Sequence, residues 1–340
     1  MGWDLGFGVW GLTRLHQTVR RTIRKHALCP PGSRVLVGLS GGSDSVALTH
    51  LLLDLAENAD FRVVALAHLN HQLRASAGRD EAFCRDLAHR LGLRIVVETA
   101  NVKRYAESGF SIEDAARRVR YEFLERAAAD ASADRIAVGH TQDDQAETFL
   151  LKLMRGAGLK GLAGIYPSRG RVIRPLLDVS RAELRAYLMA AGEPWVEDET
   201  NEDLENPRNR IRHRVLPELD RAAGGSTHRA IARAASLIRE DGQWLDEAAD
   251  LRFGQLVVRT ETGLEIEVGG LGGSPGPIRR RVLLRAMKEV AGHREIGLEH
   301  VEAVEGLLGG APQGGIDVPG SRVELRPGKL VLIEQRPVIR

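Results

Sequence analysis

The chain has 340 residues, of which 43% are hydrophobic, 28% are charged and only 4% are aromatic. This length favours two domains over a single core, and the composition is that of a folded globular protein. The net charge of +2 means that nucleic-acid binding would need locally gathered arginines and lysines. The low aromatic content argues against a platform that stacks many bases.

The sequence contains two cysteines, Cys29 and Cys84, which lie far apart. This excludes a disulfide framework and a four-cysteine zinc site, and it is typical of reduced thiols. The apolar start of the chain lacks a basic leading segment, and no stretch reaches the roughly 20 apolar residues that a membrane helix needs. We therefore expect a cytoplasmic protein with no membrane association.

Short apolar strands alternate with helices in the first part of the chain. Strand patterns lie at residues 34–40, 62–70, 94–99, 135–140 and 172–176. Helical patterns lie at residues 13–28, 44–57, 81–91, 112–131, 144–154 and 181–191. This alternation predicts βαβ units and a doubly wound parallel α/β sheet, with ligands bound beyond the carboxyl ends of its strands.

We expect a second, smaller domain, and the boundary between the two domains lies just before the small-residue stretch 222–226. This divides the chain into a catalytic domain of residues 1–219, with its sheet core from about residue 34, and a C-terminal domain of residues 220–340. The second part has helical patterns at residues 230–250, 278–290 and 298–308, and short strand patterns at residues 255–268, 321–325 and 329–333. We expect this domain to be mainly helical.

The first predicted strand ends in a loop with the sequence SGGSDS. Its glycines, Gly41 and Gly42, allow a tight turn and a close approach of backbone N–H groups to an anion. Its hydroxyl donors are Ser40, Ser43 and Ser45. The loop lacks the lysine of a GxxxxGK[ST] phosphate loop. Asp44 would repel phosphate unless a cation lay between them, and this requirement favours a Mg²⁺ ion at Asp44. The alternative is an ordinary turn in which Asp44 caps the following helix.

The SGGxDS pattern resembles the signature of the PP-loop ATP pyrophosphatases. The resemblance implies an adenine nucleotide alpha hydrolase-like fold that splits ATP between its α- and β-phosphates and forms an adenylated intermediate. It implies ATP and Mg²⁺ as cofactors, with Mg²⁺ at Asp44. It also implies ATP contacts from the loop residues Ser40, Gly41, Gly42, Ser43, Asp44 and Ser45. The superfamily includes tRNA lysidine synthetases, tRNA thiolation enzymes and the synthetase modules for GMP, NAD, asparagine and argininosuccinate, so this loop leaves the second substrate open.

The segment 139–148, GHTQDDQAET, follows a predicted strand and places Asp144 and Glu147 on one helix face. These catalytic candidates could hold Mg²⁺, or bind the ammonium group of free lysine and help its ε-amine lose a proton. A solvated acidic helix start is the alternative. The segment resembles that of the lysidine synthetases, which implies an ATP contact from His140. That family usually has a second histidine where this chain has Thr141.

Two other segments resemble the same family. Residues 68–74, HLNHQLR, resemble its HxNHxLR motif, which implies ATP contacts from His68 and Asn70 and a tRNA contact from Arg74. Residues 113–121 resemble its ExxAR.xRY helix. The resemblance implies that Arg117 or Arg120 stabilises phosphate charge during adenylate transfer, and an ion-paired helix surface is the alternative.

Basic residues suited to a phosphodiester backbone follow in two places. Residues 207–212, PRNRIR, resemble a stretch that closes the catalytic domain of the lysidine synthetases. In the C-terminal domain, a helical stripe of basic residues is either a tRNA contact or a solvated surface. The candidate tRNA-binding residues are Arg208, Arg210 and Arg212 in the first place, and Arg281 and Arg285 in the second.

These resemblances imply a tRNA-modifying ligase. ATP would adenylate the C2 oxygen of the wobble cytidine in an isoleucine tRNA with a CAU anticodon, and the ε-amine of free L-lysine would then displace AMP. The sequence leaves open whether the chain forms a homodimer. The alternatives are another PP-loop tRNA-modifying enzyme, such as a thiolase with reactive cysteines or an iron–sulfur cluster, or a non-catalytic nucleotide sensor. The intact Asp44, Asp144 and Glu147 argue against a sensor.

Overall fold

The computed structural model describes residues 6–57, 59–72, 77–100, 112–197, 203–309 and 314–335. The chain forms two compact units, Met1–Leu237 and Ile238–Arg340. This division falls inside helix α11 (Thr227–Leu256), on the C-terminal side of the boundary expected from the sequence.

The first unit contains a six-stranded sheet with the strand order β3-β2-β1-β4-β6-β5. Its strands are β1 (Ser33–Gly38), β2 (Phe61–Asn70), β3 (Ile95–Thr99), β4 (Arg135–Ala137), β5 (Ser168–Arg169) and β6 (Val172–Ile173). Neighbouring strands run parallel, except that β5 pairs with β6 in the antiparallel direction. The predicted α/β fold is therefore confirmed, but the sheet is mostly parallel instead of entirely parallel, because β5 runs against β6.

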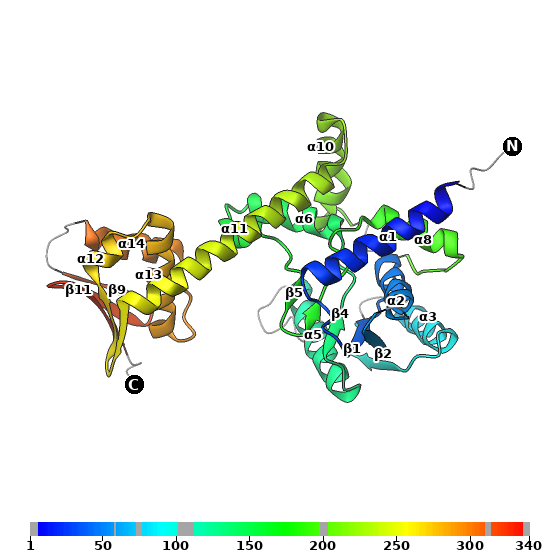
Figure 1. The fold of residues 1–340 in the computed structure, drawn as a ribbon, viewed down its shortest axis with the longest axis horizontal. Coiled ribbons are helices and arrows are strands. Elements are labelled where there is room, and N and C mark those ends of the chain that lie inside the picture. The colour runs from blue at the N-terminus through cyan, green and yellow to red at the C-terminus, as the bar shows by residue number, and fades with distance from the viewer. Residues whose placement is uncertain are drawn as a thin grey trace. The chain divides into compact units, whose positions relative to one another are not determined.

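The sheet is covered by helices on both faces (Figure 1). In β1, Val35 and Val37 point to one face and pack with helices α1, α2, α3 and α8, whereas Leu36 points to the other face and packs with α5. Because both faces are buried, β1 has a continuous apolar sequence instead of an alternating one. The helices of this region are α1 (Gly6–Lys25), α2 (Ser43–Ala56), α3 (Ala77–Arg90), α5 (Ile112–Asp130), α6 (Gln142–Leu153), α7 (Leu159–Leu162) and α8 (Arg181–Ala191).

The connections out of β1 and β4 meet at the point where the strand order reverses. Strand β1 lies between β2 and β4, and such a switch point is where open parallel sheets bind ligands. The loops after β1 and β4 come very close together there. A Cβ atom at Gly139 would lie 3.1 Å from the carbonyl carbon of Asp44, so glycine allows these two loops to meet.

The arginine-rich segment after α8 is packed against α6. It contains α9 (Pro207–Arg210), a π-helical turn η2 (Ile211–Val215) and α10 (Leu216–Ala223). Ile211 and Leu216 are buried in one cluster with Ala146 of α6. This packing fixes the intervening arginines beside the acidic start of α6.

The second unit is built around a five-stranded antiparallel sheet with the order β7-β8-β11-β10-β9. Its strands are β7 (Val257–Thr260), β8 (Gly263–Glu267), β9 (Gly315–Val318), β10 (Ser321–Arg326) and β11 (Lys329–Glu334). Its further helices are α12 (Val268–Gly272), α13 (Gly276–Ala291) and α14 (Leu298–Leu308). Side chains of α13 and α14 share one core with this sheet.

The expectation of a mainly helical second domain is therefore wrong. Each strand has only four to six residues, so each gives a weak local pattern. The sheet exists because β8 pairs with β11, which lies far along the chain, and local periodicity does not report such pairing. Within the described parts of both units, no helix is long and apolar enough to cross a membrane.

Candidate active site

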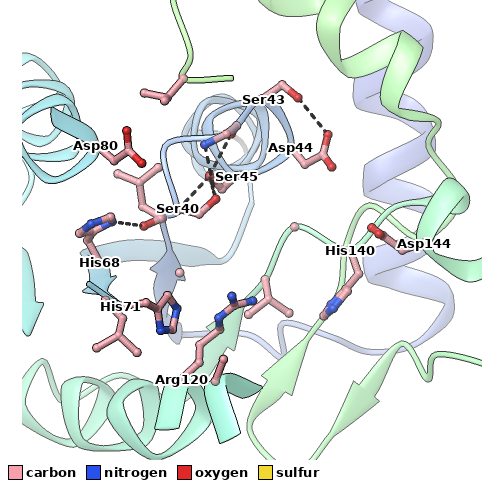
Figure 2. Close-up of a pocket in the computed structure, with 18 of the residues that line it drawn as sticks. Ser40, Ser43, Asp44, Ser45, His68, His71, Asp80, Arg120, His140 and Asp144 are labelled. Atoms are coloured by element: carbon pink, nitrogen blue, oxygen red, sulfur yellow. Dashed lines mark hydrogen bonds between the residues drawn. The ribbon is translucent and has the colours of Figure 1, made fainter. Parts of the chain in front are cut away.

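A cavity of about 1030 Å³ lies at the carboxyl edge of the parallel sheet (Figure 2). Its volume is at the upper end of the range for small-molecule sites, so it has room for a nucleotide and part of a second substrate. The cavity is formed by the ends of β1, β2 and β4, by α5 and α8, and by the arginine-rich segment. The sequence-predicted residues that line it are Ser40, Gly42, Ser43, Asp44, Ser45, His68, Asn70, Arg120, His140, Asp144, Arg208 and Arg212.

The SGGSDS loop is braced by its own hydroxyl groups. The backbone N–H of Ser40 donates to Ser45 Oγ at 3.1 Å, and that hydroxyl donates to the carbonyl of Gly42 at 3.0 Å. Gly41 has a φ of +90°, which favours glycine. Among the residues that the structure describes, no side chain caps the start of α2. Because unmet N–H groups at a helix start attract anions, this loop suits a phosphate group.

Asp144 is held in place by the cap of helix α6. Thr141 caps the helix, and its backbone N–H and Oγ1 donate to Asp144 Oδ2 at 2.8 and 3.0 Å. Thr141 is fully buried, and its two hydrogen bonds orient this site carboxylate. One turn later, Glu147 is fully buried as well.

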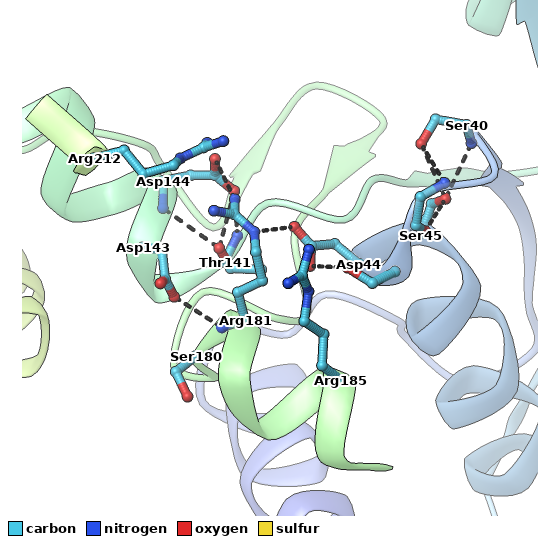
Figure 3. A network of polar contacts seen from close by, with 12 residues as sticks. Ser40, Asp44, Ser45, Thr141, Asp143, Asp144, Ser180, Arg181, Arg185 and Arg212 are labelled. Carbon is cyan, nitrogen blue, oxygen red and sulfur yellow. Dashed lines mark hydrogen bonds and ion pairs between the residues drawn. The ribbon is translucent and has the colours of Figure 1, made fainter. Parts of the chain in front are cut away.

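Arg181 contacts three carboxylates. Figure 3 shows it between Asp44 and Asp144. Its Nε donates to Asp44 Oδ2 at 3.0 Å, and its Nη2 donates to Asp144 Oδ1 at 3.4 Å. Its Nη1 is 3.9 Å from Glu147 Oε1. The sequence motifs did not identify Arg181. The available signal was the Ser-x-x-Glu capping pattern at residues 180–183, which starts a helix directly after the last strand of the sheet.

Glu147 also pairs with two arginines that follow α8. Arg212 Nε is 2.6 Å from Glu147 Oε1, and Arg208 Nε is 3.0 Å from Glu147 Oε2. Arg208 also donates to Thr148 Oγ1 at 2.8 Å. Arg208 and Arg212 therefore lie inside the cavity, whereas Arg210 is exposed and is not among its lining residues. Contact of these three arginines with tRNA stays a prediction.

The buried carboxylates are electrostatically dependent on these arginines. Burial raises the pKa of Asp44, and Arg181 partly offsets the effect. Burial likewise raises the pKa of Glu147, and its hydrogen bond with Arg212 opposes the shift. For Asp144, burial acts in the same direction, but nearby groups that include Arg181 and the Thr141 N–H outweigh it and hold the pKa below its usual value. Removing a cation from this cluster would destabilise the ionised carboxylates.

His140 is fixed as a neutral hydrogen-bond donor. Arg174 Nε donates to His140 Nδ1 at 3.2 Å, and since arginine only donates, the imidazole proton resides on Nε2. Burial, together with Arg174, lowers the pKa of His140 to about 3. Arg174 is only 4% exposed, and its other hydrogen bonds go to the Tyr166 carbonyl and the Tyr121 hydroxyl. The motifs did not identify Arg174, although a charged residue directly after a buried strand was visible in the sequence.

His68 and Asn70 brace the loops around the cavity. His68 is buried, and its Nδ1–H donates to the carbonyl of Leu39 at 2.9 Å. The Asn70 amide donates to Glu81 Oε2 at 3.0 Å. Burial lowers the pKa of His68, so this ring is also neutral.

The structure places the remaining predicted site residues in different parts of the molecule, and not all of them line the cavity. Arg120 lines the cavity, whereas Arg117 lies over the ring of Tyr121 at 5.2 Å. Arg74 lies outside the described residues. In the second unit, Arg281 pairs with Asp246 at 2.7 Å and Arg285 pairs with Asp250.

The acidic residues suit a metal that arrives together with phosphate. Among the described residues, no three His, Cys, Asp or Glu side chains are grouped so that they could hold a metal by themselves. Mg²⁺ is usually bound by one or two carboxylates together with phosphate oxygens and water. Asp44, which lies beside the phosphate loop, fits that donor set.

Comparisons with known proteins agree with this architecture. Residues 13–219 match the family model of the PP-loop domain. The solved structure of the U34-tRNA thiolase NcsA from Methanococcus maripaludis, with its [4Fe-4S] cluster, aligns with a TM-score of 0.56 at 17% sequence identity. The alignment covers 68% of this chain and 80% of the thiolase. At that identity the likeness shows a shared fold only.

Curated relatives place the chain more narrowly. It is 40% identical over 308 residues to a tRNA(Ile)-lysidine synthase from Geobacter sulfurreducens, covering 88% of this chain and 65% of that relative. It is 37% identical over 330 residues to the synthase from Dehalococcoides mccartyi, covering 93% of this chain and 68% of that relative. The chain thus spans about two thirds of the length of these two relatives. With the synthase from Leifsonia xyli subsp. xyli it is 38% identical over 311 residues, covering 90% of this chain and 91% of the relative. The chain belongs to the PP-loop proteins and, within them, to the tRNA(Ile)-lysidine synthase family.

Proposed function

We propose that this chain is an ATP-dependent ligase that converts the wobble cytidine of a CAU-anticodon tRNA(Ile) into lysidine. The observation that carries the proposal is the grouping of Asp44, Asp144 and Glu147 beside a phosphate-binding loop, in a chain of this family. The substrates are ATP, free L-lysine and the tRNA, and the products are lysidine-containing tRNA, AMP and pyrophosphate. A tRNA substrate makes the cytoplasm the site of action.

In the first step, the C2 oxygen of cytidine attacks the α-phosphorus of ATP, and the bond to pyrophosphate breaks. The loop N–H groups and hydroxyls hold the departing phosphates, and Arg120 lies in the cavity to stabilise charge on the α-phosphate. Mg²⁺, when bound with ATP at Asp44, would neutralise charge on the leaving pyrophosphate. The cytidine must leave its stack to reach the cavity, which costs about a few kcal/mol.

In the second step, the ε-amine of lysine attacks C2, the bond from C2 to the adenylate oxygen breaks, and AMP leaves. The amine must lose a proton in this step, and a carboxylate at the site can accept it. Asp144 lines the cavity and suits the positively charged substrate, and Glu147 lies one helical turn behind it, where its charge acts in support. The neutral His140, with its Nε2–H, can donate to a phosphate or carbonyl oxygen without adding charge.

The test is lysine incorporation into a CAU transcript, measured together with pyrophosphate release. The matched RNA has uridine in place of the wobble cytidine and should accept no lysine. Asp44→Asn should abolish both signals, because Asp44 lies beside the phosphate loop. Asp54→Asn is the control, since Asp54 is on the same helix but pairs with His16 and Tyr187. Wild-type ATP consumption by Asp44→Asn would refute the assignment, and a chain without any pyrophosphate release would be a nucleotide sensor.

A thiolase is the second candidate, and the cysteines disfavour it. Cys84 is fully buried, and burial raises its pKa to about 12. Burial raises the pKa of Cys29 to about 11. Since the thiolate is the reactive form, neither thiol is activated at neutral pH. A Cys29→Ser/Cys84→Ala variant should keep lysine incorporation within about twofold, with a stability loss of about 1–2 kcal/mol from the small void. A folded but inactive double variant would favour sulfur chemistry.

A further inference from the structure

One guanidinium group holds together the acidic residues that the proposed function assigns to cationic substrates. Arg181 contacts Asp44, Asp144 and Glu147 at 3.0, 3.4 and 3.9 Å. The first carboxylate is assigned to Mg²⁺ with ATP, and the other two are assigned to lysine. Arg181 therefore lies where the proposed function brings positive charge during the reaction.

The burial of this cluster makes the contacts strong. The side chains of Arg181, Asp44 and Asp144 are 19%, 20% and 13% exposed, and that of Glu147 is fully buried. Carboxylates grouped at such low exposure repel each other unless a cation lies among them. Arg208 and Arg212 approach Glu147 within salt-bridge distance. Among the residues that the structure describes, Arg181 is the cation that bridges Asp44 and Asp144.

The backbone at Arg181 is fixed, so only its side chain is free to respond. Its N–H donates to Asp143 Oδ2 at 2.8 Å, and Ser180 caps the helix in front of it. A side chain with four rotatable torsions can withdraw from Asp44 while this backbone stays in place. The Arg181 guanidinium already lies 3.9 Å from Glu147, which can keep it paired after it leaves Asp44.

We propose that Arg181 is a positioning residue that stands in for the substrate cations. In the substrate-free enzyme it bridges Asp44 and Asp144 and offsets the repulsion between them. When Mg²⁺ arrives with ATP, the side chain withdraws from Asp44, because two cations cannot share the same carboxylate oxygens without strong repulsion. The exchange makes metal binding depend on the phosphate ligands that ATP supplies, so Mg²⁺ alone does not occupy the site. This inference rests on the assignment of Asp44 to the metal in the proposed function.

The test measures Mn²⁺, a paramagnetic substitute for Mg²⁺, binding to the full chain without ATP, lysine or tRNA. Arg181→Gln removes the competing cation, and its affinity for Mn²⁺ should rise at least about fivefold over the wild type. Arg181→Lys keeps a positive charge and should remain near the wild-type affinity. Arg185→Gln is the matched control, because Arg185 lies one turn further along α8, lines the same cavity and pairs with Glu197. Its Mn²⁺ affinity should be unchanged.

An unchanged or weaker Mn²⁺ affinity in Arg181→Gln would overturn the proposal, because a merely structural arginine would damage the metal site when lost. An equal gain in Arg181→Lys would also overturn it, since charge would then not be the cause. If the glutamine variant does not fold, the wild-type chain supplies the readout. The Arg181 Nε–H resonance should shift and lose exchange protection when Mg²⁺ and a non-hydrolysable ATP analogue bind, and an unaltered resonance would refute the exchange. Neither measurement requires lysine transfer. A failure of this proposal can therefore be distinguished from a failure of the proposed function, which the activity assay tests.

Discussion

The neutral state of His140 has a measurable consequence for stability. Its pKa in the folded chain is about 3, below the ordinary value of 6.5, because the ring is buried and Arg174 lies against it. The unfolded chain therefore takes up a proton first as the pH falls. The stability that this histidine contributes is complete above pH 6.5 and is lost progressively toward pH 3.

We predict that His140 does not titrate between pH 5 and pH 8, and that the proton stays on Nε2. Replacing Arg174 with methionine removes the neighbouring charge and the donor to Nδ1, so the pKa of His140 should rise toward its ordinary value. The ¹⁵N shifts of the imidazole report both the tautomer and the titration. A wild-type ring that titrates near pH 6.5 would contradict this assignment.

Residue patterns predicted the site residues best where neighbouring residues in the sequence are enough to form the feature. The loop around Asp44 and the carboxylate pair Asp144 and Glu147 were identified from spacing, and they do lie together at the sheet edge. Arg174 and Arg181 were missed, because their roles depend on partners in other elements. A buried or shared guanidinium leaves no local pattern, since His140, the partner of Arg174, and Asp44, the partner of Arg181, lie more than 30 positions away in the sequence.

Helix α6 starts with a reciprocal pair of capping contacts. The Thr141 side chain accepts from the Asp144 N–H, and Asp144 accepts from Thr141 in return. We predict that Thr141→Ala lowers the free energy of unfolding by about 1 kcal/mol. Thr141→Ser keeps the hydroxyl and should retain most of that stability. Urea unfolding midpoints measure both, and equal losses in the two variants would show that the methyl group, and not the cap, is important.

The end of strand β4 shows why the boundaries of strands could not be predicted from the sequence. The pattern at residues 135–140 predicted one strand, but β4 ends at Ala137. The residues after it form the loop that brings Gly139 against Asp44 and His140 into the cavity. Apolar patterning identifies the buried core of a strand, whereas the exit of the chain toward a ligand depends on long-range packing.

At the scale of the whole molecule, the small net charge of +2 limits how tRNA can be bound. The basic stripe on α13 is not a bare cationic surface. Arg281 donates to Asp246 at 2.7 Å, and Arg285 pairs with Asp250 while lying over the ring of Phe253 at 4.9 Å. Exposed ion pairs of this kind are worth less than about 1 kcal/mol. A phosphate group can therefore compete with the aspartates for these arginines.

This competition leads to opposite expectations for two double variants. Arg281→Gln/Arg285→Gln should weaken tRNA binding and reduce the slope of log affinity against log salt concentration by about 1–2, because up to two phosphate contacts are lost. Asp246→Asn/Asp250→Asn frees both arginines and should strengthen tRNA binding at low salt. ATP affinity should be unchanged in both, since these residues belong to the unit that lacks the phosphate loop. Filter binding over a salt titration measures each effect. If neither variant alters tRNA affinity, the stripe only ties α13 to α11, and the tRNA contacts must be sought among the arginines at positions 208–214.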